Sequence, residues 1–145
     1  MSSSVEDNAR NGDQGTLSNV RVPSILVVDD SRDSANILSS LFGAHGFEVH
    51  VAFDWATALE TARANLPDII LLDLGMPEMD GIDATVYLNR HFPDVKILVL
   101  TMHEDHKFII QMIKLGVCSY MLKGCEEEEV ETSIRSVYEN GYYFN

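Results

Sequence analysis

Runs of branched apolar residues recur along the chain and are separated by segments with a different periodicity. Most of these runs are apolar throughout and do not alternate with polar residues, which is typical of strands buried on both faces. They therefore predict the strands of a parallel sheet. The expected strands are Ile25–Val28, Phe47–Ala52, Ile69–Leu72, Lys96–Thr101 and Val117–Leu122.

The segments that follow these runs carry apolar residues three or four positions apart, which predicts helices. In the first of them Ile37, Leu38, Leu41 and Phe42 share one helical face, and the helix ends at Gly43–Gly46. Five repeats of strand then helix indicate an α/β fold, a doubly wound five-stranded parallel sheet with helices on both faces. The other helices are expected at Trp55–Ala64, Ile82–Arg90, Phe108–Leu115 and Val130–Val137.

Composition divides the chain into a polar leader and a globular part. Residues 1–23 are rich in Ser, Asn, Gly and Asp and have almost no large apolar side chains, so we expect a disordered N-terminal leader there. One domain is expected over 24–140, with 141–145 as the C-terminal end or the start of a linker. The whole chain, 145 residues with 46% hydrophobic and 23% charged composition, is typical of a soluble globular protein.

Charge and apolar content exclude several classes of function. A formal charge of -13 argues against a nucleic-acid surface, because phosphate binding depends on Lys and Arg. Cys118 and Cys125 are too few for a disulfide framework and lack the spacing of a zinc site. The sequence has neither an apolar run of about 20 residues nor a signal peptide, so we expect no membrane contact and a cytoplasmic location.

Candidate chemistry lies where the predicted strands end. Asp29 and Asp30 follow the first strand, Asp73 ends the third, Thr101 ends the fourth and Lys123 follows the fifth. The carboxyl ends of parallel strands share one edge of a sheet, so these side chains should converge. Three neighbouring carboxylates repel one another unless protons or a cation are bound, and hard oxygen ligands suit Mg²⁺.

This set of groups is suited to receiving a phosphoryl group. Asp73 would be the nucleophile, Lys123 and the metal would neutralise the developing charge, and Thr101 would donate a hydrogen bond to a phosphoryl oxygen. A single carboxylate at a strand end could equally be a structural cap. Five polar groups at one sheet edge make that simpler explanation a poor one.

From Ser24 to about Tyr138 the chain resembles the receiver domain of a two-component response regulator. The resemblance implies a flavodoxin-like (βα)5 fold with strand order 2-1-3-4-5 and a switch protein that is not an enzyme. The motifs that carry it are Val27-Val28-Asp29-Asp30, Leu72-Asp73-Leu74-Gly75-Met76-Pro77-Glu78-Met79-Asp80-Gly81, Val99-Leu100-Thr101 and Tyr120-Met121-Leu122-Lys123.

The resemblance also implies a role for each matching residue. Asp73 matches the phospho-acceptor, and Thr101 and Lys123 match the hydroxyl and the ammonium that contact the phosphoryl group. Tyr120 resembles the aromatic switch residue. The metal ligands implied by the family are Asp29, Asp30, Asp73 and the backbone carbonyl of Gly75.

Partners follow from the same resemblance. A receiver accepts its phosphoryl group from a sensor histidine kinase or a phosphotransfer protein, and can form a phosphorylation-dependent homodimer. Residues 89–145 resemble receivers attached to helix-turn-helix regulators of transcription, whereas the first half is more similar to receivers fused to sensor kinases. The chain contains no helix-turn-helix module, so this fragment is not expected to bind DNA.

Three positions depart from the family pattern and keep alternatives open. Gly124 replaces a proline that many receivers have, Met102 is bulky where relatives carry a small residue, and substitution of His103 is expected to change autodephosphorylation several-fold. A degenerate receiver that serves only as a binding module is one alternative. A phosphatase of the haloacid dehalogenase type is another, but that chemistry needs an acid at the position of Gly75.

Overall fold

The computed structural model describes residues 22–102 and 105–144, in which strands and helices alternate. No helix in these ranges combines the length and the apolar character that a membrane crossing requires. The strands are β1 (Ser24–Val28), β2 (Glu48–Ala52), β3 (Ile69–Asp73), β4 (Lys96–Thr101) and β5 (Ser119–Leu122). The helices are α1 (Arg32–Ala44), α2 (Trp55–Ala64), α3 (Gly81–His91), α4 (His106–Lys114) and α5 (Glu127–Asn140).

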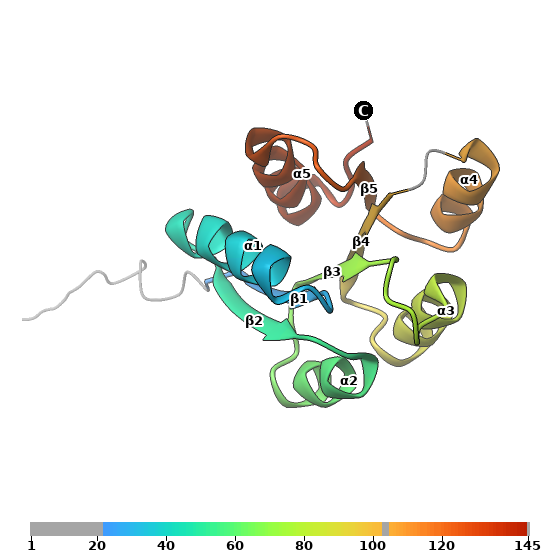
Figure 1. Ribbon diagram of the computed structural model, residues 1–145, viewed down its shortest axis with the longest axis horizontal. Coiled ribbons are helices and arrows are strands. Elements are labelled where there is room, and N and C mark those ends of the chain that lie inside the picture. Colours follow the sequence, from blue (N-terminus) through green and yellow to red (C-terminus); the bar gives the residue numbers. More distant parts are fainter. Residues whose placement is uncertain (1–21, 103–104, 145) are drawn as a thin grey trace, which may run out of the picture.

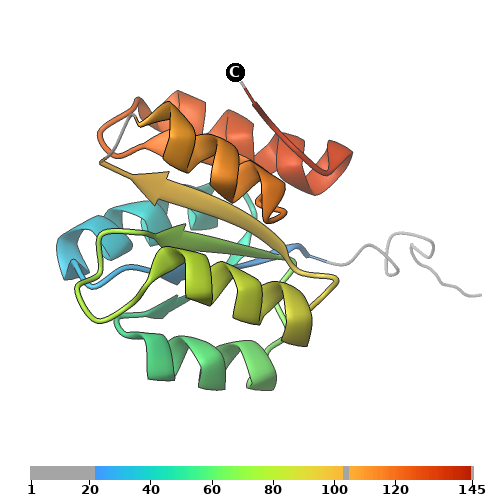
Figure 2. The ribbon, with the colours of Figure 1, turned by 90° about the vertical axis from the view of Figure 1, so that its right-hand side faces the viewer.

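The strands form one parallel sheet in the order β2-β1-β3-β4-β5, which confirms the predicted fold and strand order. Helices α1 and α5 cover one face, and α2, α3 and α4 cover the other (Figure 1). Because all the strands run in the same direction, their carboxyl ends meet at one edge of the molecule (Figure 2). That edge carries the loops in which the candidate residues lie.

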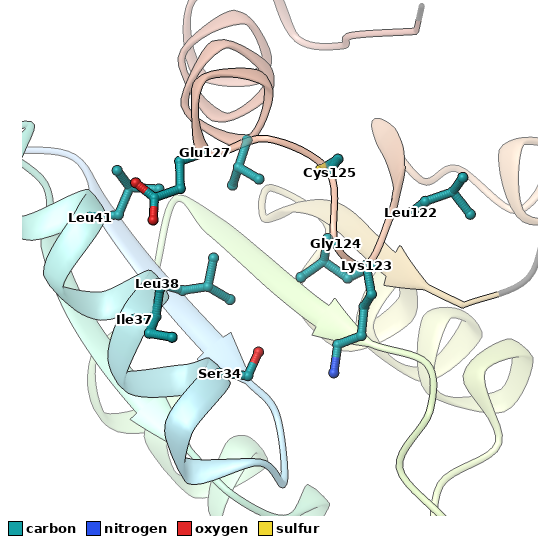
Figure 3. A pocket seen from close by; sticks show the side chains of 11 residues that line it. Ser34, Ile37, Leu38, Leu41, Leu122, Lys123, Gly124, Cys125 and Glu127 are labelled. Atoms are coloured by element: carbon teal, nitrogen blue, oxygen red, sulfur yellow. The ribbon is translucent and has the colours of Figure 1, made fainter.

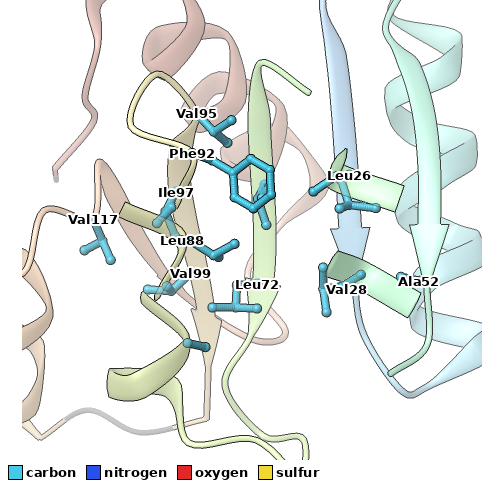
Figure 4. Close-up of a cluster of buried hydrophobic side chains, with 14 of the residues drawn as sticks. Leu26, Val28, Ala52, Leu72, Leu88, Phe92, Val95, Ile97, Val99 and Val117 are labelled. Atoms are coloured by element: carbon cyan, nitrogen blue, oxygen red, sulfur yellow. The ribbon is translucent and has the colours of Figure 1, made fainter. Parts of the chain in front are cut away.

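Each face of the sheet has its own buried cluster. The cluster beneath α2, α3 and α4 includes Leu26, Leu72 and Val99 from the central strands and Leu88 from α3 (Figure 4). Every residue of β1 and β3 is buried, as the uniformly apolar runs predict. The outer strands β2 and β5 are only partly buried, because each has a neighbouring strand on one side.

Some element boundaries and faces differ from the prediction. Strands β2 and β5 start later than expected because Phe47 and Val117 contribute to the buried clusters from the preceding loops. In α1, Leu38 and Phe42 are buried as expected, but Ile37 is 57% exposed. Helical spacing places Ile37 near the apolar face without determining whether that position is covered.

The last helix begins with an acidic turn. Glu127, Glu128 and Glu129 occupy the first turn of α5, where carboxylates interact favourably with the positive end of the helix dipole. The helix ends at Gly141, whose φ of 97° lies in the left-handed region that glycine adopts readily. The chain then turns back toward β5, where Ser119 and Tyr143 form a parallel β-bridge.

An exposed aspartate, Asp54, caps the N-terminus of α2. Asp54 accepts a hydrogen bond of 2.7 Å from the backbone N–H of Thr57. This backbone bond, assisted by the Thr57 side chain, lowers the pKa of Asp54 below its usual 3.8. The contribution of the Asp54 charge to stability is therefore present above pH 3.8 and is lost as pH falls through the lower folded-state pKa.

We expect Asp54→Asn to lower the melting temperature at neutral pH, because asparagine caps the helix but lacks the charge. The gap between wild type and Asp54→Asn should close as the pH falls below 3.8 and through the lower folded-state pKa, because the wild-type carboxylate then becomes protonated. Thermal unfolding followed by circular dichroism at a series of pH values measures this gap. A gap that stayed constant from neutral to acid pH would show that the charge plays no part.

Candidate functional site

The predicted residues converge at the carboxyl edge of the sheet. Asp29 directly follows β1, Asp73 and Thr101 end β3 and β4, and Lys123 directly follows β5. Asp29, Asp73 and Thr101 are almost completely buried, with exposed fractions of 1%, 3% and 1%. Asp30 is exposed beside them. Most of the polar side chains at this edge are therefore shielded from solvent, and Asp30 is the one that solvent reaches freely.

Backbone amides of the following loops hold the two buried carboxylates. The N–H of Ser31 donates to Asp29 Oδ1 at 2.9 Å, and the N–H of Gly75 donates to Asp73 Oδ1 at the same distance. A Cβ atom added to Gly75 would lie 3.3 Å from Asp73 Oδ1, a tight contact. These two amide contacts were not predicted, because a backbone N–H leaves no signal in the pattern of side chains.

Lys123 links the two buried carboxylates. Its Nζ donates to Asp73 Oδ2 at 3.0 Å and lies 3.5 Å from Asp29 Oδ2. In Figure 3 the side chain extends from the end of β5 toward the carboxyl end of β3. The ammonium thus lies between two carboxylates that are far apart in the sequence.

Burial and charge shift the ionisation of this pair. Burial raises the pKa of Asp73, and the neighbouring Asp29 raises it further; together they outweigh the Gly75 amide and the Lys123 ammonium, which lower it. Burial lowers the pKa of Lys123, but the adjacent Asp73 and Asp29 carboxylates outweigh that effect and leave it raised. Lys123 is therefore a fixed positive charge at neutral pH.

The carboxylates are suited to a divalent cation. One oxygen each from Asp29, Asp30 and Asp73 lies within 4.8 Å of the others. Among the described residues, no hydrogen bond reaches the buried Oδ2 of Asp29. With Lys123 as the neighbouring cation, the ionised cluster carries a formal charge of -2, which one divalent ion would neutralise. The donor set fits Mg²⁺, which prefers hard oxygen ligands.

The other predicted residues lie near this cluster or beyond it. The carbonyl of Thr101 accepts a 2.8 Å hydrogen bond from the N–H of Lys123, which joins the ends of β4 and β5. Tyr120 lies in β5, three residues before Lys123. It is half-buried and packs against the hydrophobic cluster beneath α2, α3 and α4. Met102 is 72% exposed. His103 lies outside the described residues.

Gly124 adopts the turn that its sequence position suggests. Its φ is +90°, in the left-handed region, and no cis peptide bond occurs in the part of the chain that the structure describes. The next residue, Cys125, then enters the loop that precedes α5. Glycine thus forms the tight turn after Lys123 where many receivers have proline.

An apolar hollow lies behind Lys123, between α1 and the loop that leads to α5 (Figure 3). Its volume is about 370 Å³, and its walls include Ile37, Leu41, Gly124 and Cys125. No pattern in the sequence indicates this hollow. Ile37 was expected on the apolar face of the first helix, and helical spacing alone could not separate it from the core positions.

Comparison with known sequences decides the family. The profile of the response regulator receiver domain matches residues 25–135, from β1 into α5. The chain belongs to this family. The match covers the acidic cluster, the Lys123 position and all five strands but for the first residue of β1.

Curated relatives of this receiver domain include regulators of transcription. It is 34% identical over 92 residues to the transcriptional regulatory protein DegU of Brevibacillus brevis, covering 63% of this chain and 39% of the relative. It is 37% identical over 109 residues to the uncharacterized transcriptional regulatory protein YhcZ of Bacillus subtilis (strain 168), covering 73% and 50%. The chain thus spans half or less of the length of these relatives, in agreement with its resemblance to receivers of helix-turn-helix regulators.

Solved structures share the fold of this receiver domain. A two-component response regulator of the LuxR family from Aurantimonas sp. SI85-9A1 superposes with a TM-score of 0.76 at 27% identity, covering 84% of this chain and 88% of that one. A response regulator from Thermotoga maritima superposes with a TM-score of 0.77 at 24% identity, covering 83% and 100%. The second likeness supports the fold alone.

Proposed function

We infer that Asp73 accepts a phosphoryl group from a histidine of a partner kinase or phosphotransfer protein, and that the domain then shifts between two conformations. The observation that supports this most strongly is the environment of Asp73. It is a buried carboxylate that is bonded to Lys123 and belongs to an acidic cluster suited to Mg²⁺. A carboxylate that only capped a strand would need neither the ammonium nor the two other aspartates.

The transfer is a substitution at phosphorus. A carboxylate oxygen of Asp73 forms the new P–O bond while the P–N bond to the donor imidazole breaks, and the imidazole leaves with the bonding electrons. Lys123 stabilises negative charge on the phosphoryl oxygens, and the Thr101 hydroxyl donates a hydrogen bond to one of them. The Gly75 amide fixes the orientation of the Asp73 carboxylate through its 2.9 Å bond.

Asp29, Asp30 and Asp73 would hold the metal, together with the backbone carbonyl of Gly75 that the family resemblance implies. The bound ion supplies positive charge that offsets the repulsion between the carboxylates and the phosphoryl oxygens. Ser31 supports this site indirectly, because its N–H keeps the carboxylate of Asp29 in place. We expect no enzymatic turnover, because the phosphoryl group ends covalently bound to Asp73 of the protein itself.

The conformational signal would travel from Thr101 to β5 and α4. Thr101 is joined to the end of β5 through the 2.8 Å bond from Lys123, and Tyr120 lies on β5 facing the α4 side. The output surface is then the face formed by α4, β5 and α5, where a phosphorylation-dependent homodimer or another partner would bind. It was expected over about Glu104 to Tyr138, of which Glu104 lies outside the described residues. The charge of -13 supports a protein partner over nucleic acid, and a cytoplasmic kinase is the expected donor.

Two alternative functions, a phosphatase and a degenerate receiver, fit the site less well. A phosphatase of the haloacid dehalogenase type lacks support because Gly75 stands where that chemistry needs an acid, and a Cβ there would press on Asp73. A degenerate receiver is disfavoured by the presence of the acidic cluster together with Lys123.

Beryllofluoride, a phosphoryl mimic, tests the switch. In the presence of Mg²⁺ it should shift backbone amide NMR signals near Asp73, Thr101 and Tyr120. The same addition to Asp73→Asn should leave the spectrum unchanged, because the carboxylate that would bind beryllium is missing. A wild-type spectrum without changes at β5 would identify an inert binding module.

A further inference from the structure

The chain after α5 returns to the edge of the sheet and forms an isolated β-bridge with β5. Gly141 turns the backbone, and the N–H of Tyr143 then donates to the carbonyl of Cys118 at 2.9 Å. Tyr143 and Ser119 form a parallel bridge, so this tail, Gly141–Phe144, covers part of the outer edge of β5. In Figure 1 the end of the chain lies beside β5, between α5 and α4.

A buried pair of serine hydroxyl groups also binds the tail, through the carbonyl of Tyr143. Ser119 Oγ donates to the Tyr143 carbonyl at 2.7 Å and lies 2.7 Å from Ser133 Oγ. A serine hydroxyl has one proton, so the Ser133 hydroxyl must donate to Ser119 when Ser119 donates to the tail. Both serines are fully buried, and Ser133 belongs to α5. The tail, β5 and α5 are therefore joined by one chain of hydrogen bonds.

The aromatic side chains of the tail lie beside both α5 and the hollow that α4 borders. Tyr143 packs against the buried cluster beneath α1 and α5. Phe144 lines a hollow of about 400 Å³ between α4 and α5, together with Ile109 of α4, Tyr120 of β5 and Glu129 of α5. The tail therefore packs on the α5 side of β5 through Tyr143 and borders the hollow between α4 and α5 through Phe144.

We propose that Gly141–Phe144 is a conformational latch that is docked on β5 in the unphosphorylated domain and is loosened when Asp73 is phosphorylated. The coupling rests on the proposed function of Asp73. The latch is bonded to α5 through Ser119 and Ser133, and Phe144 lines the hollow between α4 and α5. A shift of Tyr120 and α4 relative to α5 would reshape this hollow while the hydroxyl bonds hold the tail to α5, so the tail could not keep both positions.

The position of the latch gives it a consequence beyond the receiver itself. Because the tail runs parallel to β5, the backbone at Phe144 heads toward the same edge as the phosphorylation site, alongside α4. Any segment joined to Phe144 starts from the surface where the signal emerges. Release of the latch would free the start of that segment and uncover the edge of β5 at Cys118 and Ser119.

A pair of serine variants tests the docked state. Ser119→Ala removes the hydroxyl that binds the Tyr143 carbonyl, whereas Ser133→Ala leaves that bond in place and serves as the matched control. Hydrogen exchange of the Tyr143 amide, measured by NMR, should accelerate about tenfold in Ser119→Ala and about threefold or less in Ser133→Ala. Amides of β3 serve as a reference for global unfolding. Equal acceleration in both variants, or a Tyr143 amide unprotected in wild type, would overturn the docked latch.

The coupling is tested on the wild-type chain with Mg²⁺ and beryllofluoride. Exchange of the Tyr143 amide should accelerate about tenfold on addition, while β3 amides stay protected. If signals near Asp73 shift but Tyr143 exchange does not change, the coupling is wrong and the phospho-acceptor function stands. If no signal near Asp73 shifts, the acceptor function fails and the coupling fails with it, while the docked state is still decided by the serine variants.

Discussion

Replacing Asp29 with asparagine is expected to weaken Mg²⁺ binding by about 100-fold, because it removes one of the carboxylates that would hold the ion. The amide of asparagine can still accept the hydrogen bond from the Ser31 N–H, so the β1–α1 loop should keep its form. The loss would therefore come from charge and ligand chemistry, since the fold around the site is retained.

Fluorescence of the single tryptophan gives a readout for this titration. Trp55 lines a hollow together with Asp30, so an ion at the cluster changes its surroundings. Asp33→Asn is the matched control, because it removes the same charge from an exposed position in the first turn of α1, outside the acidic cluster. Equal Mg²⁺ affinity in wild type and Asp29→Asn would place the metal elsewhere.

Replacing Lys123 with methionine is expected to slow phosphoryl uptake from a small donor by roughly 100-fold, the scale for losing one charged donor at a reacting centre. Methionine has a similar length but no charge. The Nζ atom of Lys123 lies 3.0 Å from Asp73 Oδ2, so it is already placed beside the atom that would carry the phosphoryl group.

Lys96→Met is the matched control for this variant. Lys96 begins β4 at the opposite edge of the sheet, so its loss should leave the uptake rate within about twofold of wild type. The rate is followed as the phosphorylated fraction against time by intact-protein mass spectrometry, with circular dichroism to confirm that both variants fold. Equal rates in the two variants would remove Lys123 from the chemistry.

The periodicity of the sequence predicted the architecture well where burial is uniform. β1 and β3 are buried throughout and are apolar apart from Ser24 and Asp73 at their ends, so the sequence identified them as strands buried on both faces. The outer strands were harder, because Phe47 and Val117 are buried without being part of a strand. The strand order came from the family resemblance, since periodicity does not determine which strands are neighbours.

The candidate site was predictable because a parallel sheet brings its strand ends together. That rule alone placed Asp29, Asp73 and Lys123 near one another. The ammonium of Lys123 lies 3.5 Å from Asp29 Oδ2 and 3.0 Å from Asp73 Oδ2. The contacts made by the amides of Ser31 and Gly75 could not be predicted, because every residue except proline has the same N–H group.

The tail was missed for a different reason. Gly141 and the aromatic residues after it are consistent with an exposed linker, and nothing local indicates a strand. Its partner Ser119 is 24 residues away, and the hydroxyl pair with Ser133 is apparent only once α5 is packed on the sheet. Contacts of this kind depend on tertiary structure, so a pattern confined to one segment cannot contain them.

The most direct measurement for the phospho-acceptor assignment is intact-protein mass spectrometry after incubation with acetyl phosphate, with Mg²⁺ or with a chelator. The account predicts an addition of about 80 Da that requires Mg²⁺, is located in the peptide containing Asp73 and is absent from Asp73→Asn. No addition to the wild-type chain, or an addition that persists in Asp73→Asn, would contradict it.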